Sequence, residues 1–255
     1  FKRYWPFQTY YNEVQSKSSN NNKNYMISVI ETVIDIIKKS PQFCLICERV
    51  LPYQGLKPTV CDSPLCVFSH EEYGLGVNLE NSIKNDPDLV DLAITMTHAA
   101  TTATTARFNP FHPFPSTLEV KRKSAQDPTV IETHNFITLN GERDNQKVRV
   151  VLDLVPSVEK LSQWVDEGKL KDNCDELNPL LYPLLRWILA SNRSHLKKLE
   201  PHEQISEMKT KFQYCLMSST PEREKRFQEL KQQYGSVYAF HGSSLCNWHS
   251  IMREG

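Results

Sequence analysis

The sequence predicts an α+β fold, with a helix-rich N-terminal region that contains a cysteine knuckle and a C-terminal part that begins a mixed sheet. Three observations support this fold class. Apolar residues recur at helical spacing in several segments before residue 200. Four cysteines stand in two close pairs between residues 44 and 66. From residue 211 onward the pattern indicates a strand, a helix, a second strand, a turn and a last helix, which suits a mixed sheet with packed helices.

The composition of the chain limits its class and its partners. Of its 255 residues, 39% are hydrophobic, so we expect long stretches of loop or exposed helix. Thirty basic and thirty acidic residues cancel, which gives no electrostatic indication of nucleic acid or an anionic membrane as the main partner. No apolar run approaches the roughly 20 residues that span a bilayer. Seven cysteines without a secretory signature favour an intracellular, reducing compartment.

Shifts in composition divide the chain into four regions. Residues 1–40 hold a polar linker and an amphipathic helix, and residues 41–80 form the cysteine-rich knuckle. Residues 81–156 form a helix and loop region, and residues 157–255 form the sheet-building part. Because the first residue is Phe1, we expect the chain to be cut from a longer protein.

Two helices and a loop are expected in the first half of the chain. Polar residues at three- and four-residue steps over residues 25–40 leave one broad apolar face, which we expect to pack on the core. Asp86 as N-cap and Pro87 at the first helical position start the next helix, whose Thr-rich end should fray. Three prolines in "NPFHPFPS" (residues 109–116) exclude regular structure and predict an ordered loop.

Residues 129–156 admit two interpretations. Asn140 and Gly141 lie between apolar-rich runs, which favours a hairpin. A second group of residues in the same segment fits helical spacing instead, namely Val148, Val151, Leu152 and Val155. The sequence leaves both alternatives open.

The next helices carry clear end signals. Residues 157–165 form a short helix. In "NPLLYPLLRWILASN" (residues 178–192), Asn178 is the expected cap and Pro179 the first helical residue. The predicted buried face of this helix consists of Leu181, Leu184, Leu185 and Ile188.

The end of the chain supplies the expected sheet elements. Residues 211–219 are apolar and favour a strand. Residues 220–235 form a helix that Thr220 caps and Gly235 terminates. Residues 236–241, "SVYAFH", are predicted to be a buried strand, and a turn and a last helix follow.

His241, Gly242 and Ser243 form a candidate binding turn. A glycine directly after a strand lets the backbone approach a ligand, and its N–H and C=O can pair with a flat carboxamide. The neighbouring His241 can hydrogen-bond a hydroxyl group. A site that contacts both a carboxamide and a hydroxyl group suits a nicotinamide riboside. From the residues alone, a structural histidine in a turn is the more ordinary alternative.

The segment "YGSVYAFHGSSLCNWHSIMREG" (residues 234–255) closely resembles the opening of the catalytic domain in the PARP family of ADP-ribosyltransferases. The run "NWHSI" (residues 247–251) and the segment at residues 180–199 point to the subgroup of mono-ADP-ribosyltransferases numbered six and eight. The cysteine-rich segment is similar to the one that precedes the catalytic domain in that subgroup. The resemblance implies that residues 157–255 are the start of a mixed-sheet ADP-ribosyltransferase fold, truncated in this chain.

The resemblance also implies roles for the turn residues. His241 would be catalytic and would hydrogen-bond a ribose hydroxyl of NAD, Gly242 would hold the nicotinamide amide, and Ser243 would assist nearby. His249 falls outside this set and is expected to be structural, on a helix surface. NAD is then the substrate, and ADP-ribose passes to protein acceptors, including the enzyme itself, with release of nicotinamide.

Two further features follow from the resemblance. The stacking tyrosine and the third catalytic residue of the family lie downstream of the turn and are absent from this chain, so we expect the chain alone to be inactive. An intracellular location is expected, in the cytoplasm or at the nuclear envelope.

The cysteine knuckle is the second candidate site. Cys44 and Cys47 form a C-x2-C pair, and Cys61 and Cys66 form a C-x4-C pair after thirteen residues. Four thiolates so spaced can close a tetrahedral zinc site, with His70 as a reserve ligand. The alternatives are reduced cysteines packed as small apolar residues, or thiolates that accept ADP-ribose. A non-catalytic zinc-knuckle scaffold that binds proteins is the alternative to an enzyme.

Overall fold

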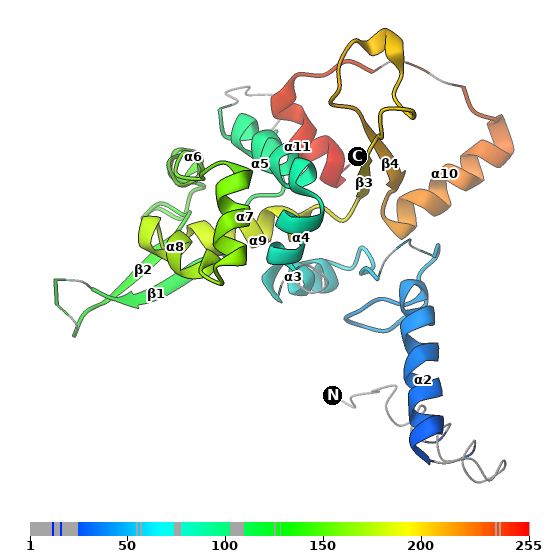
Figure 1. The fold of residues 1–255 in the computed structure, drawn as a ribbon, viewed down its shortest axis with the longest axis horizontal. Coiled ribbons are helices and arrows are strands. Elements are labelled where there is room, and N and C mark those ends of the chain that lie inside the picture. Colours follow the sequence, from blue (N-terminus) through cyan, green and yellow to red (C-terminus); the bar gives the residue numbers. More distant parts are fainter. Residues whose placement is uncertain are drawn as a thin grey trace.

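The computed structural model describes the following residues: 12, 16, 25–54, 56, 58–73, 78–102, 110–124, 126–127, 129–237, 239 and 241–254. Within them, helices predominate and the strands form two separate two-stranded antiparallel sheets. The helix-rich α+β class predicted from the sequence is therefore confirmed, but the described strands pair only antiparallel and do not form the mixed sheet expected in the C-terminal part. Figure 1 shows a helical centre from which α2 (Tyr25–Lys39) and both hairpins extend.

The main core is a helical bundle. It consists of α4 (Leu79–Asn85), α5 (Pro87–Thr101), α6 (Asn145–Leu152), α7 (Val158–Asp166), α8 (Leu170–Leu177) and α9 (Leu181–Ser191). Helix α5 is central, because it contacts α4, α6, α7 and α9 as well as the last helix, α11 (Leu245–Glu254). The predicted buried face of α9 is confirmed: Leu181, Leu184, Leu185 and Ile188 are all buried in this core.

Residues 129–156, for which the sequence left a hairpin and a helix open, contain a turn and then a helix. A turn at Gly141, whose φ is +80°, closes an isolated antiparallel bridge between Ile137 and Arg143. Helix α6 then begins, with the Asp144 carboxylate accepting the backbone N–H of Lys147 at 2.8 Å. The loop at residues 110–116 is ordered as predicted, and its Phe111 and Phe114 belong to the main core.

Two antiparallel hairpins flank the bundle. In the first, β1 (Glu119–Lys123) pairs with β2 (Ile131–Asn135), and its register places Lys123 opposite Ile131. In the second, β3 (His195–Lys198) pairs with β4 (Tyr214–Ser218), with an irregularity beside His195. A 3₁₀ turn, η2 (Ser206–Met208), lies in the connection between β3 and β4. The strand expected within residues 211–219 is therefore confirmed as β4.

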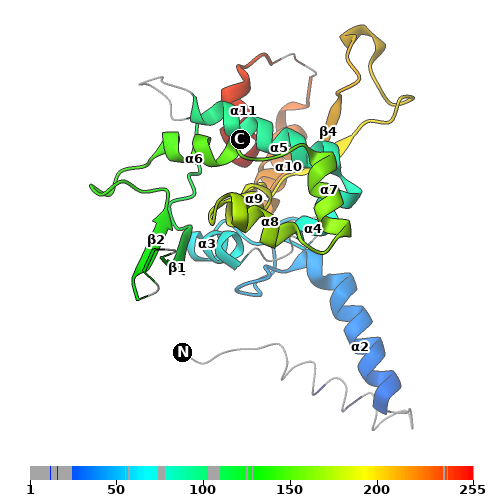
Figure 2. The same cartoon turned by 60° about the vertical axis from the view of Figure 1, so that its left-hand side comes forward.

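Helix α2 does not pack its apolar face on the core, so that prediction is wrong for the described residues. Ile30 and Ile37 are more than half exposed, whereas Ser28 and Thr32 are buried. The hydroxyl of Thr32 donates to the carbonyl oxygen of Ser28 at 2.8 Å, which satisfies it locally. Figure 2 shows α2 projecting away from the bundle, which leaves its apolar face without core to cover it. No helix in the described part of the chain has the length and apolarity to cross a bilayer.

The start of α9 also differs from the prediction. Asn178 ends α8, and its side-chain oxygen accepts the backbone N–H of Leu180 at 2.9 Å. This local bond makes a tight turn that includes Pro179. Helix α9 consequently begins at Leu181, three residues after the expected cap.

Helix α10 (Pro221–Tyr234) has the predicted extent, and Gly235 ends it with a φ of +76°. Thr220 occupies the N-cap position, but its side chain makes no capping hydrogen bond. The predicted strand at residues 236–241 is wrong where the structure describes it, since residues 236, 237, 239 and 241 are not in a strand. Tyr238 and Phe240 lie outside the described residues. A strand needs a hydrogen-bonding neighbour, and Val237 is instead 92% exposed.

Candidate functional site

Helix α11, which follows the candidate His-Gly-Ser turn, is fixed to the core by a buried histidine. His249 is fully buried, so its expected place on a helix surface is wrong, although its structural role holds. Its Nε2 atom lies 3.0 Å from the carbonyl oxygen of Pro113, and its Nδ1 atom lies 3.2 Å from the Thr97 hydroxyl. Its ring stacks on Trp187 and meets Phe111 edge-on. A carbonyl can only accept, so Nε2 carries the proton.

Burial and, after it, the positive charge of Arg253 lower the pKa of His249 to about 2. The imidazole is therefore neutral at physiological pH. This neutral form suits a packed aromatic contact and excludes His249 as a source of charge.

Arg253 provides the second anchor of α11. Its guanidinium is buried and donates to the Ser191 hydroxyl at 2.8 Å and to the carbonyl oxygen of Ile188 at 2.9 Å, both on α9. It also donates to the carbonyl oxygen of His249 at 3.2 Å. These bonds cap the end of α9 and join it to α11. Sequence reasoning missed this residue, because an arginine near a helix end usually faces water.

The His-Gly-Ser turn lies directly before α11 and is open to solvent. His241 and Gly242 are exposed, and Ser243 is half-buried. A Cβ atom placed on Gly242 would meet no atom within 4 Å. The backbone at Gly242 is therefore accessible to a ligand.

The first turn of α11 contacts both ends of this tripeptide. The side-chain amide of Asn247 donates to the Ser243 hydroxyl at 3.0 Å. The ring of Trp248 meets the His241 imidazole edge-on, with 6.3 Å between the ring centroids. The three consecutive residues therefore lie on one open loop, which the first turn of α11 contacts.

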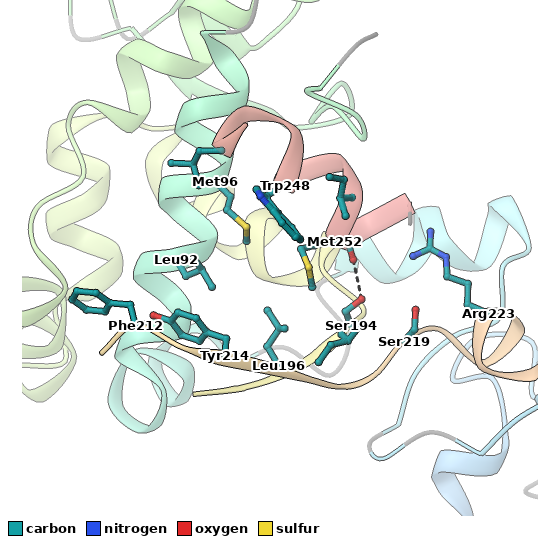
Figure 3. Close-up of a pocket in the computed structure, with 13 residues that line it drawn as sticks. Leu92, Met96, Ser194, Leu196, Phe212, Tyr214, Ser219, Arg223, Trp248 and Met252 are labelled. Atoms are coloured by element: carbon teal, nitrogen blue, oxygen red, sulfur yellow. Dashed lines mark hydrogen bonds between the residues drawn. The ribbon is translucent and has the colours of Figure 1, made fainter. Parts of the chain in front are cut away.

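An apolar groove of about 680 Å³ lies beside α11 and was not anticipated from the sequence. Figure 3 shows Trp248 and Met252 of α11 facing it together with Met96 of α5, and Leu196 and Tyr214 of the β3–β4 hairpin opposite. The Ser194 hydroxyl donates to the carbonyl oxygen of Met252 at 2.8 Å and closes one side. The lining residues come from several elements that are far apart in the chain, so no local sequence pattern predicts the groove.

The four predicted cysteine ligands form one cluster. The Sγ atoms of Cys44, Cys47, Cys61 and Cys66 all lie within 4.8 Å of one another. Cys47 is exposed, and the other three are buried. His70 is buried on α3 (Pro64–Tyr73) but does not belong to this group of converging atoms.

Local backbone geometry aims the first cysteine pair. After the 3₁₀ turn η1 (Ser40–Gln42), the N–H of Cys44 donates to the carbonyl oxygen of Arg49, and the N–H of Glu48 donates to that of Cys44, both at 2.9 Å. Glu48 has a positive φ of 60°. These bonds form a tight knuckle that turns both sulfurs toward the second pair.

The cluster holds its thiols in unequal protonation states. Burial raises the pKa of Cys66 to about 12 and also raises that of Cys61. Burial acts in the same direction on Cys47, but hydrogen bonds from the backbone and side chain of Arg49 outweigh it and lower its pKa to about 6. The Nε atom of Arg49 lies 3.4 Å from the Cys47 sulfur. Four convergent sulfurs with one stabilised thiolate have the chemistry of a soft-metal site.

Comparison with known proteins shows what the chain is similar to. Two curated ADP-ribosyltransferases are 32% identical to it over 237 residues, which cover 91% of this chain and 26% of each relative. This similarity confirms the predicted resemblance to the PARP family. Both relatives are named "Protein mono-ADP-ribosyltransferase PARP8", one from Mus musculus and one from Homo sapiens, and they do not contradict the expected subgroup.

The same comparisons also mark the extent of the match. The chain spans about a quarter of the length of these curated relatives. No family model and no solved structure matches the chain significantly.

Proposed function

We propose that the protein carrying this chain is an NAD-dependent mono-ADP-ribosyltransferase, in which His241, Gly242 and Ser243 bind NAD. The supporting observation is the open backbone of Gly242, which an added Cβ would obstruct without touching any other atom within 4 Å. His241 stands beside it, exposed to solvent. The similarity to two proteins named as mono-ADP-ribosyltransferases is the reason for assigning NAD as the ligand of this open turn.

The proposed reaction is a group transfer from NAD to a protein side chain. The bond between the anomeric carbon of the ribose and nicotinamide breaks, and its electron pair leaves with the nicotinamide. The acceptor side chain forms a new bond to the anomeric carbon and releases a proton. Gly242 holds the carboxamide through its N–H and C=O, and His241 hydrogen-bonds a ribose hydroxyl. Fixed geometry supplies most of the rate enhancement in such a site.

Replacing Gly242 by alanine separates ligand binding from folding. The added methyl group meets no neighbouring atom, so the free energy of unfolding should change by less than about 0.5 kcal/mol. The same methyl group stands where the carboxamide approaches, so the affinity for NAD or benzamide should fall at least about tenfold, about 1.4 kcal/mol. Calorimetric titration of the full-length protein measures the affinity, and urea unfolding of the chain measures stability.

Two further variants complete this experiment. His241→Ala should lower NAD affinity and transfer of labelled ADP-ribose without unfolding the chain, since His241 is exposed. Ser244→Ala, one residue beyond the proposed set, is the matched control and should bind as the unmodified protein does. A full-length protein that transfers no label from NAD, or a Gly242→Ala variant of undiminished affinity, contradicts the proposal.

We also propose that the cysteine cluster binds Zn²⁺, because four sulfurs converge within 4.8 Å. Elemental analysis of the purified chain should give about one equivalent of zinc. Cys61→Ser should lose the metal, whereas Cys215→Ser, which changes an exposed cysteine outside the cluster, should retain it. Metal far below one equivalent, together with four freely titratable thiols, contradicts the zinc site.

These proposals assign roles to two of the four regions of the chain. Residues 157–255 form the start of the catalytic domain, and residues 41–80 form a zinc knuckle that precedes it. The acceptors of ADP-ribose are proteins, including the enzyme itself, and the protein works inside the cell.

A further inference from the structure

The cysteine cluster is joined to the rest of the molecule through the loop that carries Cys61. The Asp62 carboxylate accepts a hydrogen bond from Arg193 Nη1 at 2.8 Å, and the same nitrogen lies 3.5 Å from the carbonyl oxygen of Val60. The backbone N–H of Asp62 donates to Glu222 Oε1 at 3.1 Å. The Arg193 side chain is only 12% exposed, whereas that of Asp62 is 42% exposed. Three contacts therefore connect the two residues that flank Cys61 with Arg193 and Glu222.

The partners of this loop lie where the C-terminal segments begin. Arg193 lies between the end of α9 and the start of β3, and Glu222 lies in the first turn of α10. Pro221 is the buried residue of α10, and the helix extends away from the bundle beyond it (Figure 1). Arg223, in the same first turn, donates to the carbonyl oxygen of Arg253 at 3.1 Å. The first turn of α10 is therefore its attachment point to the described molecule.

The knuckle has little apolar core of its own. Its buried cluster consists of five residues: Cys44, Leu51, Val60, Cys61 and Cys66. Three of these five are proposed metal ligands, so only two ordinary apolar side chains remain to order the loops. A cluster of this size cannot offset the conformational entropy of its loops without a crosslink, which is the general reason that small knuckles fold around a metal.

We infer that a metal ion held by the four cysteines orders the loop at residues 59–62 and, through Asp62, fixes the first turn of α10 and the start of β3. This inference rests on the proposed zinc site and adds a role that reaches beyond the knuckle. Coupling of this kind is reciprocal, so disrupting the Asp62 contacts also weakens metal binding. Helix α10 leads directly into the segment that carries His241, and Arg223 lines the apolar groove. The metal thus stabilises the helix that precedes the proposed NAD-binding turn.

Hydrogen–deuterium exchange of the purified chain tests the coupling without reference to activity. Removal of zinc by a chelator should accelerate amide exchange in peptides from residues 221–234 at least about tenfold, since their attachment point is released. Peptides from α9 should keep their exchange rates, because α9 is buried in the main core. Restoring zinc should restore the slow exchange.

The double variant Asp62→Ala/Glu222→Ala identifies the route of the coupling, because Asp62→Ala alone removes the ion pair to Arg193 but keeps the backbone N–H that donates to Glu222. This variant retains all four cysteines, so it should still bind one equivalent of zinc with lower affinity, while exchange in α10 no longer responds to the metal. Asp166→Ala is the matched control. It removes an ion pair of the same 2.8 Å length, to Lys84 on α4, and should leave the response of α10 unchanged. Glu222→Ala alone tests the direct contact between Asp62 and α10 if the double variant fails to fold.

The outcomes separate the two proposals. A chain that binds no zinc overturns the zinc site and the coupling with it. A chain that binds zinc while α10 exchanges at the same rate with and without metal overturns the coupling alone. A metal response of α10 that survives the double variant Asp62→Ala/Glu222→Ala also overturns the coupling.

Discussion

Replacing Phe111 by alanine should lower the free energy of unfolding by about 3–5 kcal/mol, the range for removing a buried phenylalanine from a packed core. Phe111 is 0% exposed. Its ring meets Phe114 edge-on at 5.1 Å between centroids and His249 at 5.0 Å. The variant would leave a cavity where the loop at residues 110–116 meets α11. Urea unfolding followed by circular dichroism measures the loss.

A second phenylalanine in the same chain is the control. Phe227 lies on α10 and is half exposed, with Lys231 over its ring. Phe227→Ala should therefore cost less than about 1 kcal/mol. Equal losses for the two variants would show that Phe111 does not occupy the core.

Lowering the pH from 7 to 5 should reduce the free energy of unfolding by about 2 kcal/mol through His249 alone. Its pKa is lowered to about 2 in the folded chain, whereas an unfolded histidine has a pKa of about 6.5. Between these values the unfolded state binds a proton that the folded state does not. Stability from this residue is therefore complete above about pH 6.5 and declines as the pH falls below it.

The corresponding measurement is a series of urea titrations between pH 7 and pH 5. His249→Phe cannot bind a proton, so its stability, although lower, should lose most of this pH dependence. His202→Ala changes an exposed histidine and should keep the slope. Carboxylates with a lowered pKa, such as that of Glu203 beside Lys197, affect stability only at more acidic pH. A wild-type slope that persists in His249→Phe would contradict the assignment.

Features with a local signal were predictable from the sequence. Pro87 marked the start of α5, and Gly235 marked the end of α10, because both residues favour particular backbone conformations. Apolar spacing identified the buried face of α9. The two cysteine pairs identified their cluster, since the short spacing within each pair limits where the sulfurs can point.

Features that depend on distant residues were not predictable. The burial of Arg253 requires Ser191 at the end of α9, 62 residues earlier in the chain. Asn178 carried a helix-start signal, but its position after α8 let the same side chain close a turn instead. Residues 236–241 have strand propensity, yet propensity cannot supply a neighbouring strand. The apolar stripe of α2 indicated a helix correctly, but not whether anything would cover it.

The anchoring of α11 determines how the proposed NAD-binding turn is held. His249 in the middle of the helix and Arg253 in its last turn clamp α11 against α5 and α9. The ten residues of α11 span about 15 Å, and the His-Gly-Ser turn sits beyond the opposite end. The helix is therefore held through its second half, and the tip that carries the proposed NAD-binding groups lies beyond its first residue. Substitutions at the tip can change its chemistry while the support keeps its position.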